Sequence, residues 1–168
     1  MKTIIWMLLG ASLAFASACT NTDTGFFGDK NGTTGHAGFG GIGSATEGSV
    51  AEFQSAIGDR VLFDVNQSTL NSESMTLLSS QAEWLISNND YKVVLEGHAD
   101  EQGTREYNLA LGARRANSVK EYLVSLGVAG DRLQTVSYGK ERPIEICSAE
   151  SCYSQNRRAV SVLENLGL

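Results

Sequence analysis

The spacing of apolar and polar residues predicts regular structure through residues 51–168. Val61 to Phe63 is a short apolar run followed by polar residues, which is typical of a strand. Between Tyr91 and Gly97 the two residue types alternate, and this predicts a second strand with two different faces. Leu133 to Tyr138 and Arg158 to Leu163 complete a set of four predicted strands.

Two helices are predicted between these strands. The first begins in the run Thr69 to Glu73, which offers helix-start side chains, and ends at the polar run 88–90. The second extends from about Arg105 to Leu126, and Gly127 occupies the position of a C-terminal cap. We expect each helix to cover a core with one apolar stripe: Met75, Leu78, Ala82 and Leu85 in the first, and Leu109, Ala113, Ala116, Val119, Leu123 and Leu126 in the second.

The order of the predicted elements is β-α-β-α-β-β. An amphipathic helix must bury its apolar stripe, and a sheet offers the complementary surface. We therefore expect an α+β two-layer sandwich, in which one mixed sheet carries both helices on the same face.

The first 18 residues are typical of an export signal. Lys2 supplies a positive charge, Ile4 to Phe15 is apolar, and residues 16–18 are small. The apolar stretch is shorter than the roughly 20 residues that a membrane-spanning helix needs. Residues 16–18 fit general signal peptidase, and Ser17-Ala18-Cys19 fits a lipoprotein signal, in which Cys19 becomes the lipidated N-terminus. We favour lipidation, because a lone cysteine here otherwise has no purpose.

Residues 19–50 differ in composition from the rest of the chain. They are rich in glycine, with scattered asparagine, threonine and serine. Such a segment cannot bury enough apolar surface to offset the entropy of ordering it, so we predict a flexible tether. The formal net charge of the full chain is −6, which argues against nucleic acid and against an anionic lipid surface as partners.

Cys147 and Cys152 lie in the predicted connection before the last strand. In an oxidising compartment we expect them to form a disulfide that closes a short loop. The alternative is half of a metal site, but the chain offers no second pair of ligands. The disulfide accounts for every cysteine if Cys19 is acylated.

The segment from Leu95 to Leu123 carries the chemistry of a binding site. It joins a strand to a helix through the polar turn GHADEQGT. The turn offers the carboxylate of Asp100, and the helix offers the adjacent guanidiniums of Arg114 and Arg115. Together these groups suit a ligand that carries both an ammonium and a carboxylate.

This segment resembles the peptidoglycan-binding segment of OmpA C-terminal-like domains. The resemblance extends from about Arg60 to Val162 and includes SYGKERP at Ser137 to Pro143 and NRRAV at Asn156 to Val160. It implies the same two-layer fold and a non-catalytic peptidoglycan-binding domain without a cofactor. It also implies that Asp100 holds the ammonium, and Arg115 the carboxylate, of the diaminopimelate in the peptidoglycan stem.

An internal salt bridge between Asp100 and Arg115 is the alternative interpretation of this pair. Exposed pairs of that kind contribute only about 0–1 kcal/mol to the free energy of unfolding. Folding alone therefore gives a weak reason to keep such a pair. The two interpretations are also compatible, since a ligand can insert between the partners of a salt bridge.

Other candidate ligand contacts have equally simple structural alternatives. Asn108 lies on the Arg115 side of the helix and is either a ligand donor or a solvated residue. Leu111 is an apolar wall of the site or part of the core. Gly97 lets a ligand approach the backbone or fits a tight turn. Arg158 lies near the site at the start of the last strand, or it is solvated or ion-paired.

The chain departs from the family pattern after the first strand. The family often has F-D-x-D there, and its second aspartate helps to surround diaminopimelate. The matching residues here are Phe63-Asp64-Val65-Asn66. Asn66 can accept a hydrogen bond from an ammonium but lacks the negative charge of an aspartate. We therefore keep it as a candidate ligand contact and expect the affinity of the site for diaminopimelate to differ from that of the family.

Catalysis and metal binding have no support in the sequence. No serine or cysteine nucleophile has a suitable histidine partner. Asp100 and Glu101 are neighbours, which is not the opposed arrangement that glycoside hydrolysis requires. We expect His98 to be a hydrogen-bonding turn residue rather than a metal ligand.

Within the family, these sequence motifs are most similar to those of members that are anchored by lipid in the outer membrane and face the periplasm. That resemblance implies a protein that ties the outer membrane to peptidoglycan, supports envelope integrity and cell division, and has TolB and other Tol-system proteins as partners. Two alternatives remain open: a soluble periplasmic peptidoglycan-binding protein with a free Cys19, and a peptidoglycan hydrolase.

Overall fold

The computed structural model describes residues 45–166, which belong to one folded unit, Gly41–Leu168. The predicted signal peptide (1–18), the lipidation site Cys19 and most of the predicted tether (19–50) lie outside the described residues. In chain order the elements are α1 (Val50–Glu52), a π-helical turn (Phe53–Ile57), β1 (Arg60–Leu62), α2 (Ser72–Ser87), β2 (Tyr91–His98), α3 (Arg105–Ser125), a 3-10 turn (Gly130–Arg132), β3 (Leu133–Gly139), α4 (Glu150–Asn156) and β4 (Arg158–Asn165).

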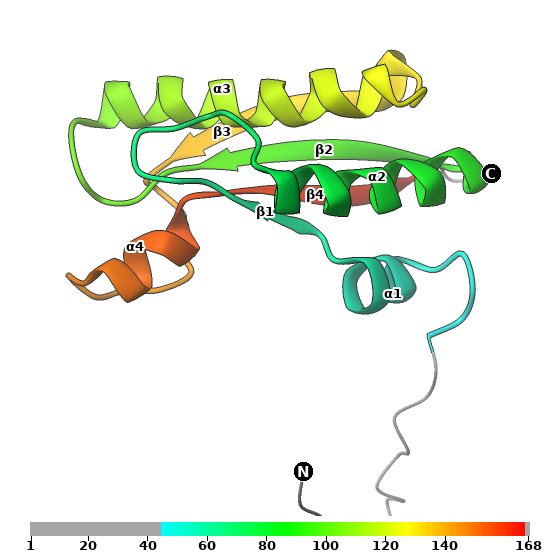
Figure 1. Cartoon of the computed structure of the whole chain (residues 1–168), viewed down its shortest axis with the longest axis horizontal. Coiled ribbons are helices and arrows are strands. Elements are labelled where there is room, and N and C mark those ends of the chain that lie inside the picture. Colours follow the sequence, from blue (N-terminus) through cyan, green and yellow to red (C-terminus); the bar gives the residue numbers. More distant parts are fainter. Residues whose placement is uncertain (1–44, 167–168) are drawn as a thin grey trace, which may run out of the picture. The chain divides into compact units, whose positions relative to one another are not determined.

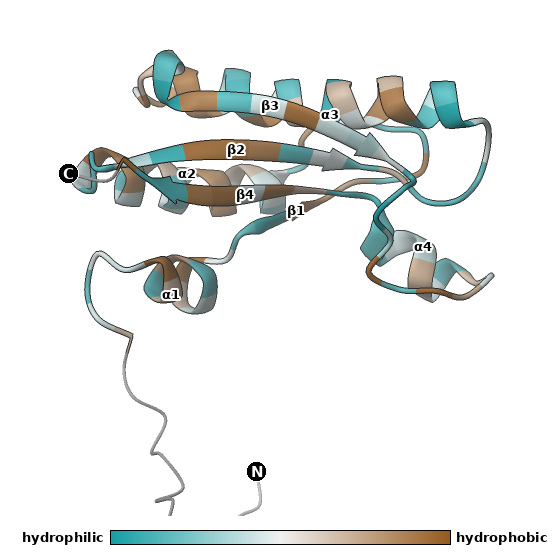
Figure 2. Cartoon of the chain, turned by 180° about the vertical axis from the view of Figure 1, so that it is seen from behind, coloured by the Kyte–Doolittle hydropathy of each residue, from teal (hydrophilic) through white to brown (hydrophobic). Residues whose placement is uncertain are grey.

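The four strands form one mixed sheet in the order β1-β4-β2-β3. β4 is antiparallel to both of its neighbours, whereas β2 and β3 are parallel and are joined by the crossover helix α3. The long helices α2 and α3 cover one face of the sheet (Figure 1). Figure 2 shows the sheet from the other side, with apolar residues in the middle of β2 and β4. The predicted α+β two-layer sandwich is confirmed.

The core lies between the sheet and the two long helices. Both predicted stripes contribute to it, with Leu78, Ala82 and Leu85 from α2 and Ala116, Val119 and Leu123 from α3. Three other stripe residues were predicted wrongly, because Met75, Leu109 and Leu126 are 39%, 49% and 36% exposed. They lie near helix ends, and in the first half of α3 the buried face is formed instead by Asn108, Leu111, Gly112 and Arg115.

The helix boundaries follow the predicted signals. The side chain of Asn71 accepts a hydrogen bond from the backbone N–H of Ser74 and caps α2, and Thr104 caps α3 in the same way. Gly127 follows α3 with a φ of 102°, a conformation that glycine adopts without strain. β1 begins and ends one residue earlier than predicted. None of the helices in residues 45–166 is long and apolar enough to cross a membrane.

Two short helical segments were not predicted. One is α1 with the turn that follows it. The chain already contacts the folded domain before residue 51, since the Tyr91 hydroxyl donates to the carbonyl of Gly48 at 3.0 Å. The other is α4, in a segment that we expected to be only a connection. The predicted disulfide between Cys147 and Cys152 is confirmed, with the two α-carbons 5.8 Å apart.

Candidate ligand-binding site

Arg115 lies at the centre of the candidate site and is fully buried. Its guanidinium donates three hydrogen bonds to backbone carbonyls: Nε to Gln67 at 2.8 Å, Nη1 to His98 at 2.7 Å and Nη2 to Asp64 at 3.1 Å. The guanidinium carbon also lies 5.2 Å from the centre of the Phe63 ring, within the range of a cation–π contact. The β1–α2 loop therefore folds over the cation.

Burial lowers the pKa of Arg115 to about 10, and the negative charge of Asp100 opposes this shift. A group with this pKa stays protonated at neutral pH. The site therefore contains a buried positive charge whose hydrogen-bonding partners, within the described residues, are neutral carbonyl oxygens. A carboxylate is a stronger acceptor for a guanidinium than a carbonyl is.

Asp100 follows β2 and is 8% exposed. Its Oδ2 lies 3.2 Å from Nη1 of Arg157, and its Oδ1 accepts the backbone N–H of Gln102 at 3.2 Å. The alternative interpretation, an internal salt bridge between Asp100 and Arg115, is therefore wrong, since Arg157 is the ion-pair partner of Asp100. Asp100 and Arg115 are nevertheless close enough for their charges to interact.

Arg157 was missed in the sequence, although the NRR motif contains it. The motif has two adjacent arginines, and we singled out Arg158. In the structure, Arg158 is buried and donates to the carbonyls of Asn156 and Arg142. The solvated interpretation of Arg158 is therefore wrong, and Arg157 is the arginine that reaches Asp100.

Asn108 and Leu111 lie on the buried face of α3 beside Arg115. The amide nitrogen of Asn108 donates to the carbonyls of Asp100 and Gln102 at 3.3 and 2.8 Å, so it braces the turn that presents Asp100. This contact excludes the solvated interpretation of Asn108. Asn66 is exposed, has a φ of 57°, and accepts a hydrogen bond from the Tyr107 hydroxyl at 3.3 Å.

Gly97 is a point of contact between β2 and α3 rather than a turn residue. A Cβ atom at this position would lie 1.8 Å from the carbonyl oxygen of Gly112, which is far inside van der Waals contact. That side of Gly97 is therefore filled by the backbone of α3, and a ligand cannot approach it there. The tight-turn interpretation is wrong, because Gly97 pairs within the sheet with Ser137 and Ala159.

His98 is the last residue of β2 and is 1% exposed. Its carbonyl accepts a hydrogen bond from Arg115, but neither ring nitrogen has a hydrogen-bond partner among the described residues. The expectation that the His98 side chain forms hydrogen bonds in a turn is therefore wrong. Burial, followed by the charges of Arg158 and Arg142, lowers its pKa to about 4. Within residues 45–166, no group of three or more metal-ligating side chains lies close enough to hold an ion.

Acid is expected to destabilise the domain through His98. The folded protein binds a proton at His98 less tightly than the unfolded chain does, in which the pKa is about 6.5. The contribution of neutral His98 to the free energy of unfolding is therefore fully present above pH 6.5 and is lost as the pH falls toward 4. The difference corresponds to about 3 kcal/mol. Urea unfolding of wild type and His98→Gln at pH 7.5, 5.5 and 4 measures it. Parallel pH profiles for the two proteins would contradict this assignment.

A hollow of about 620 Å³ lies beside these residues. The β1–α2 loop forms one side of it, and Glu150 and Arg157 form another; its lining residues are Asp64, Val65, Gln67, Thr69, Leu70, Asn71, Glu150 and Arg157. The loop that covers Arg115 therefore also borders open space, and both Asp64 and Gln67 belong to the hollow and to the guanidinium contacts.

Comparison with known proteins places this chain in a family. The model of the OmpA family matches residues 62–158. A peptidoglycan-associated lipoprotein from Mesorhizobium japonicum is 55% identical over 130 residues, which cover 77% of each chain. The protein of the same name from Pseudomonas aeruginosa is 40% identical over 154 residues, which cover 89% of this chain and 90% of the relative.

Solved structures agree with this assignment. The crystal structure of the peptidoglycan-associated lipoprotein from Burkholderia pseudomallei has a TM-score of 0.62 and 38% sequence identity, and the match covers 63% of this chain and 90% of that one. The C-terminal domain of Helicobacter pylori MotB has a TM-score of 0.60 at 21% identity over 64% of this chain and 84% of that one, which shows a shared fold. The chain therefore belongs to the OmpA family, in the branch of the peptidoglycan-associated lipoproteins.

Proposed function

We propose that the chain is a non-catalytic protein that binds the diaminopimelate-containing stem peptide of peptidoglycan at Asp100 and Arg115. One observation carries the proposal: these two opposite charges are buried in one cluster but do not pair with each other. Asp100 pairs with Arg157, and Arg115 donates to backbone carbonyls. Folding alone does not require such an arrangement, because burying a charge is costly. A ligand with an ammonium and a carboxylate matches both charges.

In the proposed complex, the ligand carboxylate replaces the carbonyls of Asp64 and Gln67 on the guanidinium of Arg115. The exchange is favourable because the new hydrogen bonds are charge-assisted at both ends. The ligand ammonium lies at Asp100. The β1–α2 loop must shift to admit the ligand, since its carbonyl oxygens occupy Nη2 and Nε in this structure.

The remaining candidates then take supporting roles. Asn108 keeps the Asp100 turn in position, and Leu111 provides an apolar wall beneath the ligand. Asn66 lies on the same β1–α2 loop, and its side-chain oxygen accepts a hydrogen bond from the ammonium after the Tyr107 hydroxyl releases it. For Gly97 and Arg158 we propose structural roles, because their contacts are made with α3 and with the chain around Arg142.

We further propose that Cys19 is lipidated and that the chain from Cys19 to about Thr46 is a tether between the outer membrane and the domain in the periplasm. The predicted tether, 19–50, ends too late, because Gly48 and Ser49 already bond to the folded domain. The names of the relatives support a lipoprotein associated with peptidoglycan. TolB and other Tol proteins are the proposed partners, in a role in envelope integrity and cell division. The intact mass of protein from the membrane fraction distinguishes this proposal from a soluble form, because acyl chains add a discrete increment.

Neutralising Asp100 is expected to weaken binding to peptidoglycan by at least about tenfold. A charge-assisted hydrogen bond is worth about 1.5–3 kcal/mol, and roughly 1.4 kcal/mol corresponds to a factor of ten. The measurement is co-sedimentation of purified wild type and Asp100→Asn with isolated sacculi of the diaminopimelate type. Glu106→Gln is the matched control, since Glu106 is an exposed acid on α3.

Wild-type protein that stays in solution with the sacculi would contradict the proposed function. Normal sedimentation of Asp100→Asn would remove Asp100 from the site while leaving the function standing. Clearing of peptidoglycan in a gel overlay that persists through purification would instead favour a hydrolase.

A further inference from the structure

The guanidinium of Arg157 lies between two carboxylates. Its Nη1 is 3.2 Å from Oδ2 of Asp100 and 3.4 Å from Oε2 of Glu150, and its Nη2 donates to Oε1 of Glu150. Nε donates to the carbonyl of Phe63 at 3.1 Å, which fixes the plane of the group. Glu150 therefore binds Arg157 through two oxygens, whereas Asp100 binds it through one.

This division matters for a ligand ammonium at Asp100. Arg157 is 5% exposed, so its positive charge is poorly screened by water. An ammonium that approaches Asp100 meets this charge as a repulsive neighbour. Because Glu150 pairs with Arg157 independently, Asp100 can contact the ammonium without leaving Arg157 uncompensated.

Charge balance leads to the same conclusion. Asp100 and Glu150 balance Arg115 and Arg157, so the cluster of four has no net charge. A zwitterionic ligand end suits a balanced cluster. If Glu150 is removed, one positive charge is in excess, and the cluster favours ligands that carry carboxylates alone.

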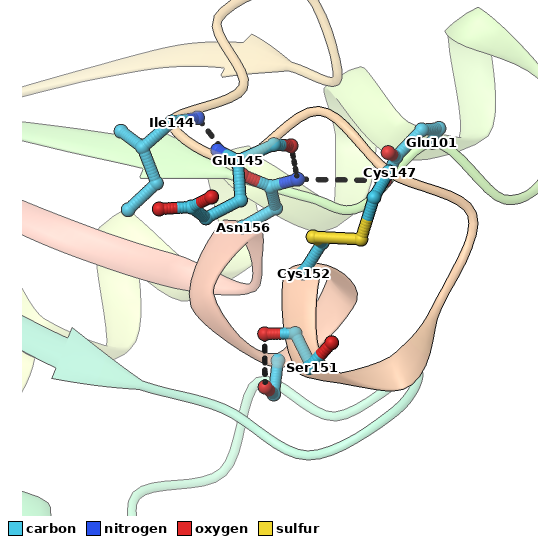
Figure 3. Close-up of a disulfide and its surroundings, with 8 residues drawn as sticks. Glu101, Ile144, Glu145, Cys147, Ser151, Cys152 and Asn156 are labelled. Carbon is cyan, nitrogen blue, oxygen red and sulfur yellow. Dashed lines mark hydrogen bonds between the residues drawn. A yellow bond between two sulfur atoms is a disulfide. The ribbon is translucent and has the colours of Figure 1, made fainter.

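The loop around α4 holds Glu150 in place. Glu150 is the first residue of this seven-residue helix and lies between Cys147 and Cys152, which form the disulfide. The Asn156 side chain closes the other end: its Oδ1 accepts from the backbone N–H groups of Ile144 and Glu145, and its Nδ2 donates to the Glu145 carbonyl (Figure 3).

The other contacts of this loop lie at its start, where Glu141 pairs with Arg105 and Arg142 stacks on the Tyr138 ring and accepts from Arg158 through its carbonyl. Residues 141–151 are all exposed, so apolar burial contributes little there, and a helix as short as α4 is marginal without tertiary contacts. We propose that Glu150, held by the Cys147–Cys152 loop, is the positioning residue that makes the site selective for an ammonium group. This inference rests on the proposed function and adds the origin of its selectivity.

The test compares two ligands that differ only in their ammonium groups: meso-diaminopimelate and pimelate. Calorimetric titration of the full-length protein measures both dissociation constants for wild type, Glu150→Gln, and the double variant Cys147→Ser/Cys152→Ser. Glu145→Gln is the matched control, because it removes an exposed charge from the same loop. We expect Glu150→Gln to weaken diaminopimelate binding by roughly tenfold while pimelate binding holds or tightens.

The double serine variant is expected to shift the ratio of the two dissociation constants in the same direction, and Glu145→Gln is expected to leave that ratio as in wild type. If Glu150→Gln weakened the binding of both ligands by the same factor, so that the ratio of their dissociation constants stayed as in wild type, the proposal would be overturned. A purely structural role predicts no change in selectivity. A wild-type ratio in the double serine variant would overturn the role of the disulfide. Wild type that binds neither diaminopimelate nor sacculi would instead overturn the proposed function itself.

Discussion

Gly97→Ala is expected to destabilise the domain by about 3 kcal/mol or more, at or above the upper end of the usual cost of overpacking a core. The added methyl group would lie 1.8 Å from the carbonyl oxygen of Gly112 and 2.5 Å from its carbonyl carbon. Both atoms are backbone, so no side chain can rotate away. The helix must move off the sheet, and the close-packed core beneath it loses contact.

The displacement also reaches the proposed site. Arg115 follows Gly112 by one helical turn and depends on α3 to reach the carbonyls of Gln67, His98 and Asp64. We therefore expect Gly97→Ala to lower the melting temperature by about 10 °C or more and to weaken ligand binding. Thermal unfolding followed by circular dichroism measures the first effect.

Gly130→Ala is the control for this substitution. A Cβ there lies 3.6 Å from Cγ2 of Val124, an ordinary contact, so we expect a change within about 0.5 kcal/mol. Equal stability of Gly97→Ala and wild type would mean that β2 and α3 are not as close in solution as this packing requires.

The periodicity of the sequence was sufficient to predict the architecture, because most of the fold depends on apolar stripes. Leu78, Leu85, Val119 and Leu123 occur at helical spacing and are buried where the stripe predicts. The stripe failed at Leu109, where the buried face of α3 becomes polar. Hydropathy cannot predict that Asn108 is buried, because the contacts that satisfy its amide come from the turn before the helix.

The candidate site could be located from the sequence, but its pairing could not. Asp100 and Arg115 lie close enough for their charges to interact, yet the ion pair joins Asp100 to Arg157, 57 residues away. The NRR motif alone gives no reason to prefer its first arginine to its second. That choice depends on α4, whose seven residues carry no stripe and which is held by a disulfide and one asparagine.

Arg115→Ala is expected to affect both stability and binding, which differs from what an outward-facing arginine would give. The side chain is fully buried, and its loss leaves the carbonyls of Gln67, His98 and Asp64 without their donor. The unsatisfied buried carbonyl of His98 costs about 1–3 kcal/mol, and the part-buried carbonyls of Gln67 and Asp64 add less because water can reach them, so we expect a loss of about 2–4 kcal/mol in all. This corresponds to a fall of about 10 °C or more in melting temperature.

A second substitution separates the two effects. Arg115→Lys keeps the charge but has no planar fork, so it cannot hold a carboxylate through two parallel hydrogen bonds. We expect it to retain more stability than Arg115→Ala and still to bind sacculi at least about tenfold more weakly than wild type. Co-sedimentation is measured at a temperature where each variant is folded.

Arg114→Ala is the matched control, because the neighbouring arginine is exposed and points away from the buried face of α3. It should bind and melt like wild type. If Arg115→Ala melted like Arg114→Ala but still failed to sediment, Arg115 would face solvent in the free protein, and the carbonyls of the β1–α2 loop would not be what a ligand displaces. If Arg115→Ala and Arg115→Lys both lost stability but still sedimented with sacculi, the guanidinium would be a brace for the loop alone, and the ligand carboxylate would need another cation.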